Sequence, residues 1–125
     1  MNNALREVWE RYVGSWKVAS AAEKRAIFPT CLAADCVYTD PLTQAKGWDE
    51  LTAYMAAFHA QLPGGHFVTQ EFFAHHGRSA ARWKMVGGDG TALGEGISYA
   101  EYDAQNRLVT MTGFFEPPPG SAPSA

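Results

Sequence analysis

The fold is decided by the segment from His66 to Phe115, which reads HFVTQEFFAHHGRSAARWKMVGGDGTALGEGISYAEYDAQNRLVTMTGFF. Within it, apolar residues recur at every second position, the period of a strand with one buried face. We expect four strands, over His66–His76, Ser79–Val86, Leu93–Tyr102 and Leu108–Phe115. The turns between them are short and rich in Gly, Asp and Asn, at Gly77-Arg78, Gly87–Gly90 and Asp103–Asn106. Such short connections predict an antiparallel meander.

The residues before this segment carry helical periodicity instead. From Leu5 to Trp16, apolar side chains recur at the i, i+3, i+4, i+7 spacing of one helix face. A second helix is expected after Ser20, because Glu23 stands three residues later at the spacing of a capping box. It should run through Ile27 and be interrupted at Pro29.

The link between the second helix and the meander is expected to hold a short strand and a third helix. A short helical turn should lead to Ala34-Asp35. The β-branched and aromatic run Cys36–Thr39 then predicts a strand, which Asp40-Pro41 ends. The third helix should open at Gly47 and close at Pro63-Gly64-Gly65.

This order of elements predicts an α+β, cone-shaped fold. Three N-terminal helices should pack on a strongly curved, mostly antiparallel sheet and enclose an apolar pocket at one end. We expect a single domain over residues 1–116 and a flexible, Pro-rich tail over residues 117–125.

Composition narrows the class of partner. The chain has 125 residues with a formal net charge of −3, and no cluster of Lys and Arg, so we expect no nucleic-acid partner. It has no apolar run long enough to span a bilayer and no secretory leader, so we expect no membrane and a cytoplasmic location. Aromatic residues make up 13% and charged residues only 18%, which favours a homodimer that hides part of the surface.

The cysteines and histidines do not indicate a metal site. Cys31 and Cys36 lie five apart, which is neither a zinc nor a thioredoxin spacing, and we interpret them as reduced thiols. His75 and His76 are adjacent on an expected strand, so they should face opposite sides and not chelate together. Either of them could still act alone as a general acid or base. We expect no metal and no cofactor.

Several short motifs together resemble the nuclear transport factor-like, cystatin-like cone superfamily, and within it the SnoaL-like and ketosteroid-isomerase-like proteins. The resemblance covers nearly the whole chain up to Glu116. It rests on Arg11-Tyr12-Val13, Val37–Pro41, Gly47, Arg82-Trp83 and Arg107-Leu108-Val109. It implies the fold more specifically than any one activity, because the superfamily includes catalysts, binding modules and assembly partners.

The resemblance to ketosteroid isomerases also implies roles for three residues. Tyr12 matches the tyrosine that donates a hydrogen bond to a developing enolate, and Asp40 matches the aspartate that shuttles the proton. Ser98 stands where the isomerases have a protonated aspartic acid, and a serine is a weaker donor there. The candidate catalytic residues are therefore Asp40, Tyr12 and Ser98.

Each of these candidates also has a plain structural interpretation. Asp40 could bind turn amides ahead of Pro41, and Tyr12 could be a core aromatic on the apolar stripe of its helix. Trp83 alternates with Ala81 and Met85 on one strand face, where it could form a flat pocket wall or simple core packing. The full set of expected pocket residues is Trp16, Tyr54, Phe58, Trp83, Met85, Met111 and Phe115.

Two classes of function remain open. The first is a cofactor-independent isomerase, or a cyclase like those of polyketide synthesis, that moves a proton next to a carbonyl of a small hydrophobic or polycyclic substrate. The second is a non-catalytic module of the same fold that binds a small apolar ligand or dimerises.

Overall fold

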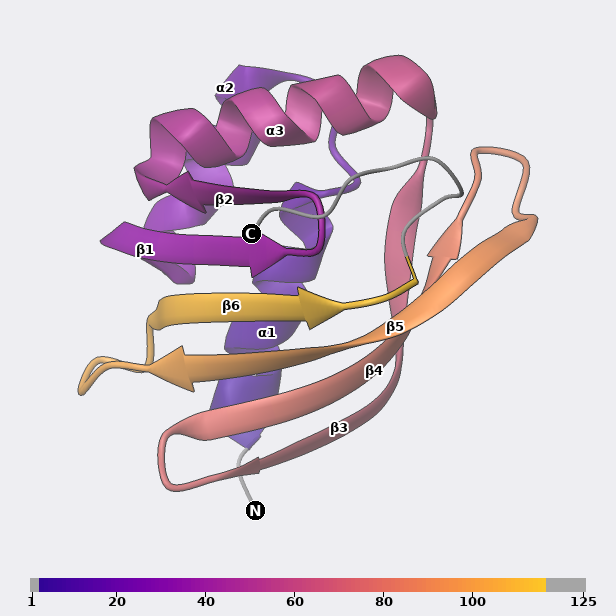
Figure 1. Ribbon diagram of the computed structural model, residues 1–125. Helices are drawn as coiled ribbons and strands as arrows, with labels where there is room; N and C mark the ends of the chain where they lie inside the picture. The colour runs from indigo at the N-terminus through magenta and orange to yellow at the C-terminus, as the bar shows by residue number, and fades with distance from the viewer. Residues whose placement is uncertain (1–2, 117–125) are drawn as a thin grey trace.

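The computed structural model describes residues 3–116, which form three helices, a short 3₁₀ turn and one six-stranded sheet (Figure 1). The helices are α1 (Asn3–Ser15), α2 (Ala21–Ile27) and α3 (Gly47–Gln61), and the 3₁₀ turn is η1 (Phe28–Thr30). The strands are β1 (Leu32–Asp40), β2 (Thr43–Lys46), β3 (His66–His75), β4 (Arg78–Val86), β5 (Ala92–Tyr102) and β6 (Leu108–Phe114). The expected tail over 117–125 lies outside the described residues.

The sheet is curved and unclosed, and its strand order is β2-β1-β6-β5-β4-β3. The meander from β3 to β6 is antiparallel throughout, as predicted. β1 joins the far side of β6 in parallel, and β2 adds an antiparallel edge. In Figure 1 the long strands β3 to β5 bend across the molecule, with α1 behind them and α3 along the top, beside β2 and β1. The predicted α+β class and curved, mostly antiparallel sheet are confirmed.

The prediction was wrong between Leu32 and Asp35, where a strand replaces the expected helical turn. The helical residues end in η1, and Leu32 already pairs with Leu108 of β6. Pairing along the sheet therefore outweighs the local propensity of an alanine-containing segment. The register between β1 and β6 shifts between Leu32 and Val37, so this early part of the strand is irregular.

The sequence also did not predict β2, which folds back on β1 through a tight turn. Asp40 pairs with Thr43, so only Pro41 and Leu42 lie between the two strands. One carboxylate oxygen of Asp40 accepts hydrogen bonds from the backbone N–H groups of Leu42 and Thr43, at 2.8 and 3.1 Å. The residue expected to end the strand thus also directs the chain into the next one.

The β3–β4 turn differs from the prediction in a way that affects the histidines. His75 pairs with Arg78, so the turn consists of His76 and Gly77, both with positive φ (49° and 71°). Because His76 has left the strand, its ring does not face away from that of His75. The Nδ1 atoms of the two rings lie 3.1 Å apart, which corrects the expectation of opposite faces.

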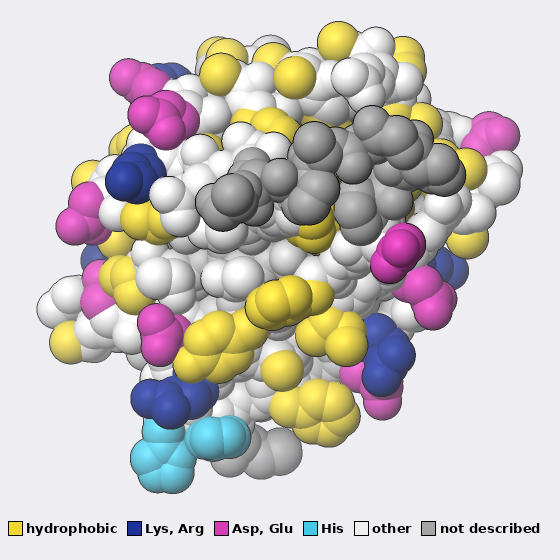
Figure 2. Space-filling view, in the orientation of Figure 1, with side chains coloured by type: hydrophobic (Ala, Val, Ile, Leu, Met, Phe, Trp, Pro, Cys, Tyr) yellow, Lys and Arg dark blue, Asp and Glu magenta, His cyan; other side chains and the backbone are white. Residues whose placement is uncertain are grey.

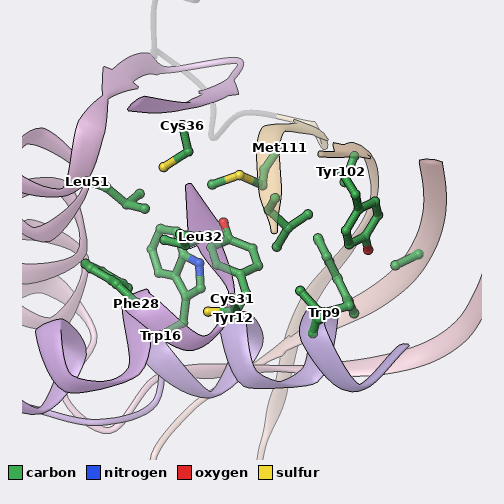
Figure 3. Close-up of a cluster of buried hydrophobic side chains, with 14 of the residues drawn as sticks. Trp9, Tyr12, Trp16, Phe28, Cys31, Leu32, Cys36, Leu51, Tyr102 and Met111 are labelled. Atoms are coloured by element: carbon green, nitrogen blue, oxygen red, sulfur yellow. The ribbon is translucent and has the colours of Figure 1, made fainter. Parts of the chain in front are cut away.

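The core lies between the helices and the concave face of the sheet. In Figure 3, Trp9, Tyr12 and Trp16 project from α1 toward the strands, and Phe28, Leu51 and Met111 belong to the same buried cluster. Cys31 and Cys36 are buried in it as free thiols. This packing fills one end of the concave face, and the other end remains hollow.

α2 is held by polar contacts at its N-terminal end and at its middle. Its capping box forms as predicted, with Ser20 and Glu23 exchanging hydrogen bonds. Lys24 is buried, and its ammonium group donates to the carbonyl oxygens of Ser15 and Val18 where α1 ends. A cation is favourable at that position because the C-terminal end of a helix is negative.

Candidate functional site

The hollow end of the cone is a cavity of about 580 Å³. Residues from α1, β1, α3 and every strand of the meander contribute to its wall. Most of its surface is apolar and aromatic. The aromatic residues that line it are Trp9, Tyr12, Trp16, Tyr38, Tyr54, Phe58, Phe67, Trp83 and Phe115. This volume is within the range of sites for small organic molecules.

Asp40 lies in the wall of this cavity and is only 5% exposed. Its Oδ1 accepts the two turn amides of Leu42 and Thr43, and its Oδ2 accepts hydrogen bonds from two phenols. The hydroxyl of Tyr38 lies 2.5 Å from Oδ2 and that of Tyr54 lies 2.7 Å from it. The carboxylate thus has four donors, about as many as its two oxygens accept. Asp40 thus orders the turn that follows β1 and also lines the cavity.

The two phenols that bind Asp40 come from different elements. Tyr38 is two residues before Asp40 on β1, so both side chains lie on the same face of that strand. Tyr54 reaches the same oxygen from the middle of α3. Burial raises the pKa of both hydroxyls well above the usual range, and the neighbouring Asp40 adds to the increase. Both phenols therefore stay protonated as donors.

Tyr12 of α1 also lines the cavity. The residue is 3% exposed, and its hydroxyl forms no hydrogen bond with Asp40, Tyr38 or Tyr54. Burial is the main cause that raises its pKa above the usual range, and the charge of Asp40 acts in the same direction. A neutral phenol in an apolar wall is a donor for a polar atom of a ligand.

Ser98 lines the cavity from β5, and its side chain is hydrogen-bonded to a tryptophan. The indole N–H of Trp83 donates to Oγ of Ser98 over 3.0 Å, which leaves the serine hydrogen free to donate. Gly113 of β6 faces Ser98 across the strand pair. A Cβ at Gly113 would lie 3.7 Å both from Oγ of Ser98 and from Cβ of Asp40, so the glycine keeps the space between these two side chains open.

The ring of Trp83 lies flat across Gly96 of β5. A Cβ at Gly96 would approach atoms of that ring to 2.5 Å and the carbonyl oxygen of Phe114 to 2.7 Å. The absence of a side chain at Gly96 therefore lets the indole of Trp83 form part of the cavity wall.

The expected pocket residues lie in the cavity wall with one exception. Trp16, Tyr54, Phe58, Trp83, Met85 and Phe115 line the cavity, as do the three candidate catalytic residues. Met111 does not line it and is 1% exposed in the core. It belongs to the buried core cluster on the concave side of the sheet, at the filled end of the cone.

Sequence reasoning missed Tyr38 and Phe67 as cavity residues. Tyr38 could have been found from the period of two, because it must share a face with Asp40. Phe67 stacks on Phe58 with ring centroids 5.2 Å apart, a contact between β3 and α3 that no local pattern predicts. No histidine lines the cavity within the described residues, which removes His75 and His76 as acid or base for a ligand held there.

Within residues 3–116 no group of three or more His, Cys, Asp or Glu side chains is arranged to hold a metal ion. No helix of that range is long and apolar enough to cross a membrane. The polar residues that line the cavity are three acids (Asp40, Glu95 and Glu116), three tyrosines, three tryptophans, Ser98 and Gln61.

Three helices on a curved, open sheet, with an aromatic cavity at one end, define a cystatin-like α+β protein. The chain belongs to the family of SnoaL-like domains, whose model matches residues 4–116. The resemblance stated from the sequence is confirmed. None of the curated proteins matches the sequence.

Solved structures give the same assignment of the fold. A proposed isomerase of the SnoaL-like family from Agrobacterium tumefaciens superposes with a TM-score of 0.81, at 21% identity over 89% of this chain and 96% of its own. A proposed SnoaL-like polyketide cyclase from Jannaschia superposes with a TM-score of 0.73, at 11% identity, over 90% of this chain and 85% of its own. A protein with a ketosteroid-isomerase-like fold from Catenulispora acidiphila, in complex with trimethylamine, superposes with a TM-score of 0.73. The two sequences are 13% identical, and the match covers 88% of this chain and 85% of that protein. At these identities the similarity establishes the fold.

Proposed function

We propose that this protein is a cofactor-independent isomerase or cyclase that moves a proton next to a carbonyl of a small hydrophobic or polycyclic substrate. The observation that carries the proposal is the position of Asp40, a buried carboxylate in the wall of an aromatic cavity that Tyr12 and Ser98 also line. General-base catalysis needs a carboxylate within reach of a bound C–H group and a donor for the oxygen on which charge develops.

The four hydrogen bonds of Asp40 suggest the route of the proton. Because both lone pairs of Oδ2 are occupied by phenols, a substrate proton reaches this carboxylate through the oxygen of Tyr38 or Tyr54. The C–H bond breaks as the tyrosine oxygen takes the proton, and the phenol passes its own proton to Asp40. The electron pair of the C–H bond moves into the enolate. Return of a proton along the same route to a different carbon gives the isomer and restores Asp40.

Tyr12 and Ser98 would stabilise the enolate oxygen. Tyr12 supplies a phenol that is bound by none of the three members of the Asp40 cluster, and Ser98 supplies a hydroxyl hydrogen while its oxygen is held by Trp83. Both are neutral donors, so each stabilises developing negative charge without a counter-charge of its own. A serine is a weaker donor than the acid found in ketosteroid isomerases, which favours substrates more acidic than simple steroid ketones.

The proposal is tested by deuterium exchange, which detects proton abstraction whatever the final product is. A panel of cyclic and aromatic ketones is incubated with the protein in D₂O, and incorporation at the carbon next to the carbonyl is followed by NMR. We expect exchange with at least one ketone, and a loss of about a hundredfold or more in Asp40→Asn. Tyr12→Phe should cost less, because Ser98 can still donate. Exchange that is unchanged in Asp40→Asn would contradict the proposal.

The second candidate function is a non-catalytic ligand-binding module. The saturation of Asp40 by four donors favours it, because a base with no free lone pair in the resting state is less accessible to substrate. The similar fold that holds trimethylamine is an example of small-molecule binding in this architecture. Ketones that bind the cavity but show no exchange would support this function over the first.

We also propose that two copies associate through the convex face of the sheet. Figure 2 shows hydrophobic side chains gathered over β4, β5 and β6 on this face. Neighbouring strands place these exposed residues side by side: Ile97 pairs with Phe114, and Tyr99 pairs with Ala80, which itself pairs with Phe73. Phe73 and Phe114 are 65% and 60% exposed, which is costly for two phenyl rings unless a second surface covers them.

A further inference from the structure

The charges around the cavity are all of one sign. The charged residues that line it are Asp40, Glu95 and Glu116, and no Lys, Arg or His contributes to the wall within the described part of the chain. The two ion pairs of residues 3–116, Arg25–Asp49 and Arg82–Glu71, lie elsewhere at the surface. Asp40 is thus a buried carboxylate with hydrogen-bond donors but no cationic partner, although buried charges are normally paired.

The walls that surround Asp40 are aromatic rings in mutual contact. Trp16 is the centre of this group, with the ring centroids of Tyr38, Tyr54, Phe58 and Phe67 at 5.3 to 6.0 Å. Phe67 continues the wall to Trp83, which contacts Phe115. The face of an aromatic ring carries partial negative charge and attracts cations, most strongly in a site from which water is excluded.

These two features favour the same kind of ligand. A positive charge inside the cavity gains from the ring faces and from the field of Asp40, whose interactions are strengthened by the low local dielectric. A negative charge meets the opposite field, and no cationic side chain among the described lining residues compensates it. The net charge of −3 on the whole chain also favours the approach of cations.

We propose that the cavity selects molecules carrying a positively charged amine, protonated or quaternary, attached to an apolar body, and excludes carboxylates and phosphates of the same size. The inference rests on the proposed role of the cavity as a small-molecule site and specifies its substrate class. In this arrangement the amine lies against the ring faces, and Asp40 acts on it through space while its oxygens remain bound by Tyr38 and Tyr54.

The test compares three probes that differ mainly in charge: benzyltrimethylammonium, its neutral isostere neopentylbenzene, and the anion phenylacetate. Binding to the wild-type protein is followed by the fluorescence of the cavity tryptophans and by calorimetry. We expect the cation to bind at least about tenfold more tightly than the neutral isostere, and the anion at least about tenfold more weakly. Equal affinities, or an anion that binds as tightly as the cation, would overturn the inference without any variant.

A matched pair of variants assigns the preference to Asp40. Asp40→Asn removes the charge inside the cavity. The affinities of this variant for the cation and for the neutral probe should then differ by no more than about threefold. Asp35→Asn removes the same charge from an exposed position earlier on β1 and should leave the preference unchanged. Circular dichroism verifies that each variant is folded. A preference that persists in folded Asp40→Asn would contradict the role given to this carboxylate.

The outcomes also separate this inference from the proposed reaction. If benzyltrimethylammonium binds selectively but no ketone exchanges deuterium, the charge preference is supported and the proposed isomerase activity is contradicted. If neutral ketones exchange deuterium but the three probes bind equally, the proposed isomerase activity is supported and the charge preference is contradicted.

Discussion

The hydroxyl of Tyr54 lies 2.7 Å from Oδ2 of Asp40 and connects the middle of α3 to the end of β1. The same oxygen accepts a hydrogen bond from the hydroxyl of Tyr38. One carboxylate therefore joins a helix, a strand and the turn that follows the strand. A buried charge held in this way fixes the position of three elements around the cavity. Its loss should therefore be measurable in stability as well as in function.

Tyr54→Phe should destabilise the protein by about 1.5–3 kcal/mol, the usual value of a hydrogen bond to a charged group. Urea denaturation measures the change. Tyr99→Phe is the matched control, because it removes a tyrosine hydroxyl bonded to a carboxylate, Glu101, at the surface. It should change the free energy of unfolding by less than about 0.5 kcal/mol. Equal effects of the two substitutions would mean that the Asp40 cluster is not a stabilising centre.

Gly96→Ala should displace the indole of Trp83 from the cavity wall. The added methyl would overlap the ring and also meet the backbone carbonyl of Phe114, which cannot move freely. We expect a loss of about 1–3 kcal/mol in stability and a shift in tryptophan emission. Gly94→Ala, two residues earlier on β5, meets only Cε of Met85 at 3.9 Å and should cost less than about 1 kcal/mol. A Gly96→Ala protein as stable as the wild type would contradict the packing described for Trp83.

Lys24→Met should destabilise the junction between α1 and α2. Methionine retains the apolar stem but leaves the carbonyl oxygens of Ser15 and Val18 without their donor, at a cost of about 1–3 kcal/mol. Lys17→Met is the control, because Lys17 is an exposed lysine in the link between α1 and α2. It should change the free energy of unfolding by no more than about 0.5 kcal/mol. Thermal unfolding of both variants checks the difference. The interpretation fails if Lys24→Met unfolds at the wild-type temperature.

Stability should fall as the pH rises above about 9. Burial raises the pKa of the Cys31 thiol to about 12 and that of Cys36 to about 11, from an ordinary value near 9. Between pH 9 and 11 the unfolded chain loses these protons and the folded chain keeps them. The folded state then binds more protons, so raising the pH favours unfolding. Urea denaturation under reducing conditions should show a loss of about 2 kcal/mol between pH 8 and pH 10.

Two measurements check the part played by the thiols. A double Cys31→Ala and Cys36→Ala variant should show a smaller loss over the same pH range, even if it is less stable throughout. In the wild-type protein, both thiols should resist a disulfide reagent at pH 8 until urea is added, since both are buried. Rapid labelling of the folded protein would contradict the burial on which the pH dependence rests.

Phe114→Asp should convert the proposed dimer into a monomer. A carboxylate in place of this exposed ring is well solvated in the monomer and would be desolvated in an interface. Ala57→Asp on the exposed side of α3 introduces the same charge away from the sheet and should leave the mass unchanged. Light scattering measures both. A wild-type protein that is monomeric at micromolar concentration would remove the proposal.

The sequence by itself determined the elements with strong local signals. The period of two between His66 and Phe115 predicted the meander, and the capping box at Ser20 predicted the start of α2, because both signals depend only on near neighbours. Several short motifs together, among them the one that ends in Asp40-Pro41, indicated the family, and alternation along β4 put Trp83 on the same strand face as Ala81 and Met85. These features follow from backbone geometry, which repeats along a chain.

Only the tertiary structure decided what each of these residues contacts. Met111 and Phe115 share one strand face, but the helices fill the cone at Met111 and leave it open at Phe115. Tyr54 meets Asp40 because α3 crosses the end of β1, and His76 turns toward His75 because the hairpin needs two residues with positive φ. The strand at Leu32 forms because a partner, β6, is available 76 residues later. Contacts of this kind depend on how segments that are distant in the sequence pack together, and the local periodicity of the sequence does not determine that packing.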